Sequence, residues 1–152
     1  RLTRYLNNGT SSTALKSYLT TIRKWAPQEP VIHIDDSDIV KPDGYKFEAL
    51  GLVRDGSKST PSKTVYEKGY HVINNHPVSI FSKIHSSKEK NFTSNNDVTF
   101  SAMERGAALF GKATFAMDRG YDDNKMFLKL DELEQDYVIR LTAKRKLFFH
   151  GK

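Results

Sequence analysis

The sequence predicts an α/β domain in which helices flank a mixed sheet and a short helical segment precedes it. Short apolar runs that are typical of buried strands alternate with longer segments whose apolar residues recur at helical spacing. Their order along the chain is strand, hairpin, helix, strand, helix, strand. A length of 152 residues is enough for one such domain with a single core.

Residues 1–30 are predicted to form an accessory helical segment. Its helix begins at one of the polar residues 11–13, any of which can cap a helix, and continues to about Trp25. The proline-containing stretch at 26–30 ends the helix because proline has no backbone N–H to donate. An apolar stripe packs this helix on the rest of the domain, and its members are Leu15, Tyr18, Leu19 and Ile22.

The first half of the remaining chain is predicted to contain three strands. They are residues 31–34, 70–73 and 78–84. The stretch Asn74-Asn75-His76-Pro77 predicts a turn that joins the last two strands in a hairpin. Residues 41–64 are rich in Gly, Ser and Lys, and they predict a loop with a short ordered stretch at 47–52.

The second half is predicted to alternate helices and strands. Its elements are a helix at 97–110 capped by Asp97, a strand at 113–117, a helix from Asp122 or Asp123 to about Glu134, and a strand at 137–141. Gly111 ends the first of these helices. The expected inner faces are Phe100, Met103, Ala107 and Phe110 in the first helix, and Met126, Phe127, Leu130 and Leu133 in the second.

The predicted topology brings the strands at 31–34 and 113–117 together. A strand–helix–strand passage gives parallel neighbours through a right-handed crossover. If these two strands are neighbours, their C-terminal ends lie at the same edge of the sheet. In open α/β sheets this edge is where functional sites form.

Composition excludes several classes of protein. Apolar residues make up 38% of the chain and charged residues 28%, which suits a water-soluble globule. No apolar run is long enough for a membrane helix, and residues 1–5 lack the apolar region of a signal peptide. The absence of cysteine excludes disulfides, a thiolate zinc site and a cysteine nucleophile, and it fits a reducing compartment.

Charge is unevenly distributed along the chain. Residues 1–28 and 137–152 contain five basic residues each and no acid, whereas residues 29–136 contain all 18 acidic residues. An acidic centre between basic flanks suits a metal-dependent enzyme that acts on a polyanion. A solvated surface with a chance division of charge is the alternative explanation.

The most informative residues are two acids that follow predicted strands. Asp36 comes shortly after the first strand and Asp118 comes directly after the fourth. Two such carboxylates attract hard divalent cations such as Mg²⁺ or Mn²⁺. A pair of ions about 3.5–4 Å apart activates water at a phosphodiester and stabilises the leaving oxygen. The alternatives are a turn for Asp36 and a helix cap for Asp118.

The alternation of side chains along a strand selects among the first group of acids. Asp36 shares a face with Ile32 and Ile34, so we expect Asp36 to be the primary ligand. Asp35 or Asp38 is then a supporting partner.

The residues that share a strand face with Asp118 have small side chains. Thr114 and Ala116 share its face and leave room for a metal ion and a phosphate. Arg119 is placed to pair with that phosphate or to hold the carboxylate.

Other residues give no competing chemistry. The five histidines lack metal-ligand spacing, and His71, His76 and His85 are expected to be ordinary polar groups. Residues 51–56 do not form a glycine-rich phosphate loop. Ser37 has no evident His and Asp partners for acyl chemistry.

Several segments resemble DDE transposases of bacterial insertion sequences, in the insertion-sequence-four branch. Residues 32–42 (IHIDDSDIVKP) resemble the first catalytic segment of that family, and residues 115–122 (FAMDRGYD) resemble the second. Further similarities occur in the family's order, at residues 53–57, 67–70, 84–92 and 137–141. The resemblance covers about residues 31–149.

This resemblance implies an RNase H-like fold, two Mg²⁺ or Mn²⁺ ions, and DNA strand cleavage and strand transfer at transposon ends. Asp36 and Asp118 take the first and second catalytic, metal-binding positions, and we expect Lys41, Arg54 and Arg119 to contact DNA phosphates. The implied partners are transposon-end DNA, target DNA and a second protomer of a synaptic homodimer. The implied location is the bacterial cytoplasm, in association with the nucleoid.

The third acid of the family is missing from its expected place. The family pattern is Tyr-x2-Arg-x3-Glu-x6-Lys, and Tyr137 and Arg140 match its first spacing, but Lys144 stands where Glu belongs. We therefore expect that acid after Lys152, which makes residues 31–152 a catalytic core that is incomplete at its C-terminus. With two of three ligands, this chain is expected to bind metal weakly and to be inactive, and strand transfer by it would contradict this expectation.

Two other functions fit the same residues. The first is an RNase H-like nuclease that cuts DNA without joining it. The second is a non-catalytic DNA-binding remnant whose acids are structural. In a transposase, the basic N-terminal helix and the basic C-terminal strand would extend the DNA-binding surface.

Overall fold

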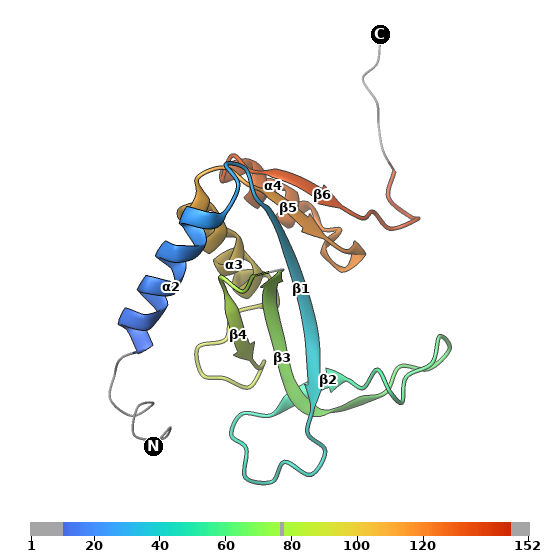
Figure 1. Cartoon of the computed structure of the whole chain (residues 1–152). Coiled ribbons are helices and arrows are strands. Elements are labelled where there is room, and N and C mark those ends of the chain that lie inside the picture. The colour runs from blue at the N-terminus through green and yellow to red at the C-terminus, as the bar shows by residue number, and fades with distance from the viewer. Residues whose placement is uncertain (1–10, 77, 147–152) are drawn as a thin grey trace.

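A mixed sheet of six strands forms the centre of the structure (Figure 1). The computed structural model describes residues 11–76 and 78–146. The strands are β1 (Val31–Val40), β2 (Gly51–Arg54), β3 (Tyr66–His76), β4 (Ser82–His85), β5 (Thr114–Met117) and β6 (Asp136–Ile139). Their order is β2-β3-β1-β5-β6, and β4 also pairs with β3.

The polarity of the strands follows the predicted topology. β1 pairs antiparallel with β3 and parallel with β5, and β5 pairs parallel with β6. This order and polarity agrees with the RNase H-like mixed sheet that the sequence resemblance implies. The prediction that the first and fourth apolar runs form parallel neighbours is confirmed.

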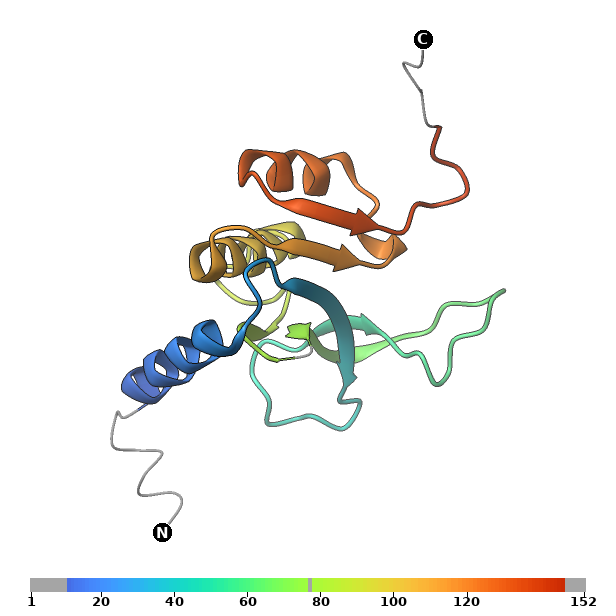
Figure 2. The same cartoon turned by 45° about the horizontal axis from the view of Figure 1, so that its top comes forward.

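Helices flank this sheet. They are α2 (Ser11–Trp25), α3 (Asn95–Phe110), α4 (Asn124–Glu132) and a short 3₁₀ helix, η1 (Arg119–Tyr121). α3 and α4 lie side by side over the strands, while α2 extends from one end of the domain and contacts α3 (Figures 1 and 2). The chain therefore has the flanking helices and the preceding helix that the sequence predicts.

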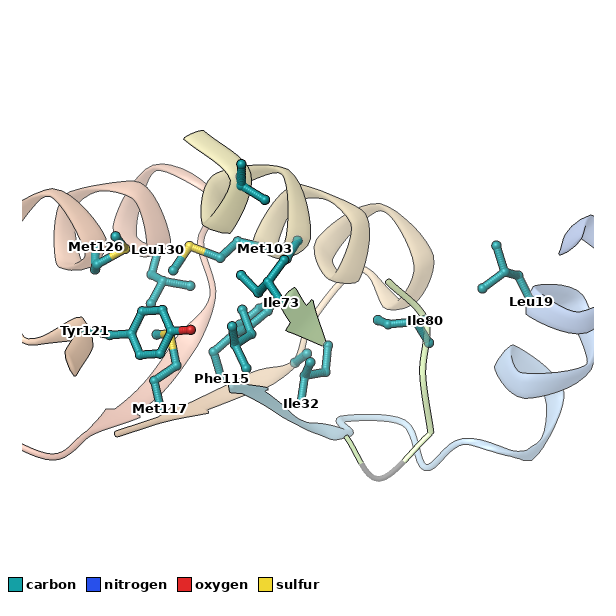
Figure 3. Packing of buried hydrophobic residues seen from close by; sticks show 14 residues of the cluster. Leu19, Ile32, Ile73, Ile80, Met103, Phe115, Met117, Tyr121, Met126 and Leu130 are labelled. Carbon is teal, nitrogen blue, oxygen red and sulfur yellow. The ribbon is translucent and has the colours of Figure 1, made fainter. Parts of the chain in front are cut away.

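The core lies between the sheet and the pair α3 and α4 (Figure 3). Ile32 and Ile34 of β1 are buried while their neighbours Val31 and His33 are exposed. In β5, Phe115 is fully buried. Because alternate residues of a strand point to opposite faces, one face of β1 and β5 packs on the helices and the other face is left open.

β1 is longer than predicted, and this changes where the acids lie. The sequence predicts that the strand ends at Ile34, but β1 continues to Val40 because β3 pairs with it from His33 to Val40. The alternative interpretation of Asp35–Asp38 as a turn is therefore wrong. These acids lie within a strand that has lost β5 as a neighbour but keeps β3.

The hairpin is also shifted relative to the prediction. Asn74, Asn75 and His76 belong to β3 and not to a turn, because they extend the pairing with β1. The third strand begins at Ser82 and not at residue 78. The predicted loop at 41–64 contains the strand β2, which pairs with the early part of β3.

Helix boundaries agree closely with the sequence. α3 begins at Asn95 because Ser94, and not Asp97, is its N-cap and accepts a hydrogen bond from Asp97 N. Gly111 ends α3 as predicted, with a φ of 81° that favours glycine. Asp123 caps α4, which confirms one of the two predicted starts.

The packing of α2 is weaker than its apolar stripe predicts. Leu19 is buried, but Leu15 and Tyr18 remain exposed. Within the accessory segment, residues 1–10 lie outside the described residues, as do residues 147–152 of the predicted core and Pro77 of the predicted turn.

Candidate active site

The candidate site lies where β1 and β5 stop pairing. The last matched pair of these parallel strands is Ile34 with Met117. Asp35 and Asp36 follow on one strand and Asp118 on the other. The fold therefore brings the two predicted catalytic acids, which are far apart in the sequence, to the same end of the same strand pair.

Asp118 is held by the turn that it begins. It is the N-cap of η1, and its Oδ1 accepts a hydrogen bond from Gly120 N at 2.7 Å. This turn is tight, because a Cβ on Gly120 would lie 2.9 Å from Asp118 Oδ1. Asp118 itself is exposed, so one carboxylate oxygen fixes the turn while the group remains accessible to a ligand.

The acids divide between the two faces of the sheet. Asp118 and Asp35 line one shallow cavity on the open face, together with Ala116 and Arg140. Asp36 pairs across β1 and β3 with the buried Ile73, and antiparallel partners share a face. Asp36 thus approaches the strand end from the helical side, whereas Asp35 approaches it from the side of Asp118.

The electrostatic environment of Asp36 disfavours its ionised form. Partial burial raises the pKa of Asp36, and the negative charges of Asp38, Asp35 and Asp118 raise it further. His71 opposes this effect. Because carboxylates that repel one another are stabilised by a shared cation, this donor set fits a hard divalent ion with oxygen ligands.

Those acids are not arranged as a complete coordination shell. Among the residues that the structure describes, no group of three or more His, Cys, Asp and Glu side chains is placed to hold one metal ion. A divalent ion held by Asp36 and Asp118 would therefore take its other ligands from water, from phosphate or from further groups, as Mg²⁺ commonly does.

Tyr121 is a site residue that the sequence analysis did not identify. It is buried, and its hydroxyl has no hydrogen-bond partner in the described structure. Burial raises the pKa of Tyr121, and the charges of Asp36, Asp35 and Asp118 raise it further. The signal in the sequence is its position, three residues after Asp118 in a turn too short to carry an aromatic ring away from the acids.

A polar network supports β1 behind the acids. Asp38 Oδ1 lies 2.7 Å from His71 Nδ1, within ion-pair distance, and Asp38 Oδ2 accepts a hydrogen bond from Arg54 N at 3.0 Å. His71 stacks on His85 with ring centroids 5.4 Å apart, and His85 Nε2 lies 3.2 Å from Asn95 Oδ1. Both histidines therefore make structural contacts that run from α3 to the strand of Asp36.

The three predicted phosphate contacts lie at different distances from the acids. Arg119 directly follows Asp118, and the backbone of Arg54 bonds to Asp38. Lys41 is five residues beyond Asp36, or roughly 17 Å along an extended strand. All three are exposed. The fold brings Arg119 next to the acids and leaves Lys41 at the far end of β1.

A second cluster anchors the chain that follows β6. The Asp122 carboxylate accepts hydrogen bonds from Thr142 N and Oγ1 at 2.7 and 2.8 Å, and the Arg145 guanidinium contacts it. Arg145 also lies over the Phe127 ring, 4.8 Å from its centroid. These contacts hold residues 142–146 beside the η1 turn that carries Asp118.

Comparisons with known proteins give one structural similarity. No protein-family model and no curated protein sequence matches the chain. The fold is similar to a structure described as "Mos1 transposase paired-end complex with left transposon end", with a TM-score of 0.40 and 10% sequence identity over 82% of this chain. The chain spans 39% of the length of that protein. No helix among the described residues is long and apolar enough to cross a membrane.

Proposed function

We propose that this chain is part of the catalytic domain of a DDE transposase, which cleaves DNA at insertion-sequence ends and transfers the freed strand to target DNA. One observation carries the proposal. Asp36 and Asp118, which occupy the first two catalytic positions by sequence resemblance, follow the last matched pair of two parallel strands in an RNase H-like sheet. The partners we propose are transposon-end DNA, target DNA and a second protomer.

In this proposal Asp36 and Asp118 hold two Mg²⁺ or Mn²⁺ ions. The ions, when bound, supply activation of water and stabilisation of the leaving oxygen at the phosphodiester. The carboxylates contribute negative charge at a fixed place, because β1 and the η1 turn hold their backbones. Asp35, which lines the same cavity as Asp118, is a further oxygen donor on the open face.

Basic residues around the acids hold the DNA backbone. Arg119 lies next to Asp118 and is the residue we expect to touch the scissile phosphate. Arg54 and Lys41 follow along β2 and β1 and bind phosphates further along the strand. The basic helix α2 and residues 140–146 extend this surface at the two sides of the domain.

Two alternative functions are compatible with the same geometry. An RNase H-like nuclease would use the acids to cut DNA without joining it. A DNA-binding remnant would keep the acids for structure alone, as the cap formed by Asp118 illustrates. These alternatives differ from the proposal in strand transfer and in metal binding, and both properties are measurable.

We also propose that the protein is located in the bacterial cytoplasm, in association with the nucleoid.

Metal binding by site variants tests the catalytic proposal. Mn²⁺ titrations followed by electron paramagnetic resonance compare the chain with Asp36→Asn, Asp118→Asn and the exposed loop control Asp43→Asn. We expect both site variants to lose bound Mn²⁺ and the control to retain it. Equal binding by all four proteins would favour the remnant. Joining of paired transposon ends by the wild-type chain would show strand transfer and would contradict the expectation that two of three ligands leave the chain inactive.

A further inference from the structure

We propose that the outer face of β2 and β3 binds an unpaired DNA strand, with aromatic rings stacking on bases and basic side chains pairing with phosphates. The edge patch consists of Tyr45, Leu52, Arg54, Tyr66 and Lys68. This inference rests on the proposed function in taking DNA as the partner, and it shares Arg54 with the phosphate contacts proposed above. β2 lies near the end of β1 that is away from β5 and β6 (Figure 1).

Strand pairing makes the patch continuous. Leu52 lies opposite Lys68, and Arg54 lies opposite Tyr66, in the antiparallel register of β2 and β3. Residues opposite each other in such a pair point to the same face, and so do residues two apart on one strand. An aromatic, an aliphatic and two basic side chains are therefore nearest neighbours on one surface.

The large apolar side chains of this surface are strongly exposed to solvent. Tyr45 is 83% exposed, Leu52 66% and Tyr66 62%. Large apolar side chains gathered on one face are characteristic of interaction sites, whereas single ones are common on any protein surface. No helix in the described structure packs on this side of β2 and β3.

The loop that presents Tyr45 is fixed against β3. Lys68 Nζ lies 5.9 Å from the centroid of the Tyr45 ring, which is within range of a cation–π contact. The Tyr70 hydroxyl donates a hydrogen bond to Glu48 O, and Lys41 N donates to Lys68 O at 2.7 Å. These contacts hold the Tyr45 ring beside the strands, which reduces the entropy lost when a ligand binds.

Charge on the patch favours a nucleic acid. Arg54 and Lys68 have no carboxylate within salt-bridge distance among the residues described. Glu67, the acid between Tyr66 and Lys68 on β3, points to the opposite face and pairs with Lys58 at 3.0 Å. The patch thus joins unneutralised cations to flat rings, the combination with which proteins bind single-stranded nucleic acid.

The patch lies close enough to the acids for one DNA strand to contact both. Lys68 lies beyond the pair of Val40 with Gly69, near Lys41. Lys41 is roughly 17 Å from Asp36 along β1. A strand cut at the acids would therefore reach the patch within a few nucleotides of the cut.

Binding measurements on surface variants test this inference. Fluorescence anisotropy without divalent cations measures the affinity for an unpaired oligo(dT) strand and for a hairpin duplex. The double variant Tyr45→Ser/Tyr66→Ser removes the rings, and Arg54→Gln/Lys68→Gln removes the charges. The matched controls are Leu128→Ser, an equally exposed apolar side chain on α4, and Lys88→Gln/Lys90→Gln on an exposed loop.

We expect loss of the rings to weaken binding of oligo(dT) at least about fivefold and to change duplex binding little. Loss of the charges should weaken both and reduce the salt dependence by about 0.7 per lost phosphate contact on the single strand. Unchanged affinity of the ring variant, equal losses in the controls, or no binding of DNA by the wild-type chain would overturn the inference.

Self-association is the competing use of the patch. If the ring variant leaves DNA affinity unchanged but converts a dimer to a monomer in sedimentation, the patch is a protein interface and the inference is overturned. The anisotropy assay contains no metal and scores no cleavage. Its failure is therefore distinguishable from a failure of the Mn²⁺ titration that tests the catalytic proposal.

Discussion

Asp38 and His71 face each other across β1 and β3, and His71 Nδ1 lies 2.7 Å from Asp38 Oδ1, within ion-pair distance. The second oxygen of Asp38 accepts from Arg54 N. With both oxygens engaged, Asp38 is not free to turn toward a cation at the strand end. Its negative charge nevertheless remains close to Asp36 and raises the pKa of that carboxyl group.

This repulsion predicts that Asp36→Asn stabilises the fold at neutral pH. The folded-state pKa of Asp36 is raised, so the folded chain binds the proton more tightly than the unfolded chain. The stability that Asp36 contributes is therefore lost as pH rises from 3.8 through its raised pKa. Because Asp36 is partly solvated, we expect a gain of a few tenths of a kcal/mol, up to about 1 kcal/mol, in urea unfolding at pH 7.

The same urea unfolding measurement in the presence of Mn²⁺ tests whether Asp36 binds the ion. Mn²⁺ should raise the urea midpoint of the wild-type chain and leave that of Asp36→Asn nearly unchanged, because a ligand stabilises only the state that binds it. The exposed loop variant Asp43→Asn should behave as wild type in both conditions. A lower midpoint for Asp36→Asn at pH 7 would show that the ionised carboxylate stabilises the strand.

The candidate acids could be predicted from the sequence because their position depends on local pattern and on one topological rule. The apolar alternation at Ile32 and Ile34 assigned the face of Asp36, and the right-handed crossover predicted that Asp118 would reach the same edge. The length of β1 could not be predicted. Residues 35–40 lack an apolar pattern and become a strand only because β3, some 30 residues later in the chain, pairs with them.

The side-chain contacts around the acids could not be predicted from the sequence for a similar reason. The contacts of Asp38 with His71 and with Arg54 N join three strands, and no spacing in the sequence indicates them. Tyr121 reads as an ordinary loop aromatic until η1 turns its ring into the core (Figure 3). Long-range pairing, which local sequence patterns do not encode, therefore decided the parts that sequence analysis missed.

The buried hydroxyl of Tyr121 predicts that Tyr121→Phe is tolerated or stabilising. A buried donor without a partner costs about 1–3 kcal/mol, and phenylalanine removes it while keeping the ring that packs in the core. We expect an increase of about 1 kcal/mol in the free energy of unfolding. Circular dichroism melting would measure it, with Tyr137→Phe as the matched control. A decrease would mean that the hydroxyl has a partner in solution.

His85 predicts a loss of stability on mild acidification. Burial lowers the pKa of His85 below its usual value of 6.5, so the unfolded chain binds the proton more tightly. The contribution of His85 is complete above pH 6.5 and is lost as pH falls from 6.5 to its folded-state pKa. Urea unfolding at pH 7.5 and 5.0 should show a smaller difference for His85→Gln than for wild type. An equal difference in both proteins would assign the acid sensitivity to other groups.

The contacts of Asp122 with Thr142 and Arg145 predict that the ionised Asp122 carboxylate holds residues 142–146, which follow β6, in place. Hydrogen bonds from Thr142 and the charge of Arg145 lower the pKa of Asp122, so the ionised carboxylate stabilises this contact at neutral pH. In Asp122→Asn the Arg145 guanidinium loses its charge partner, and one oxygen that accepts hydrogen bonds is replaced by a donor. Limited trypsin digestion should then cut after Arg145 faster than in wild type, whereas the exposed control Asp131→Asn should not change the rate. If Asp122→Asn were cut at the wild-type rate, packing of the Arg145 side chain on Phe127 would be sufficient to hold the segment.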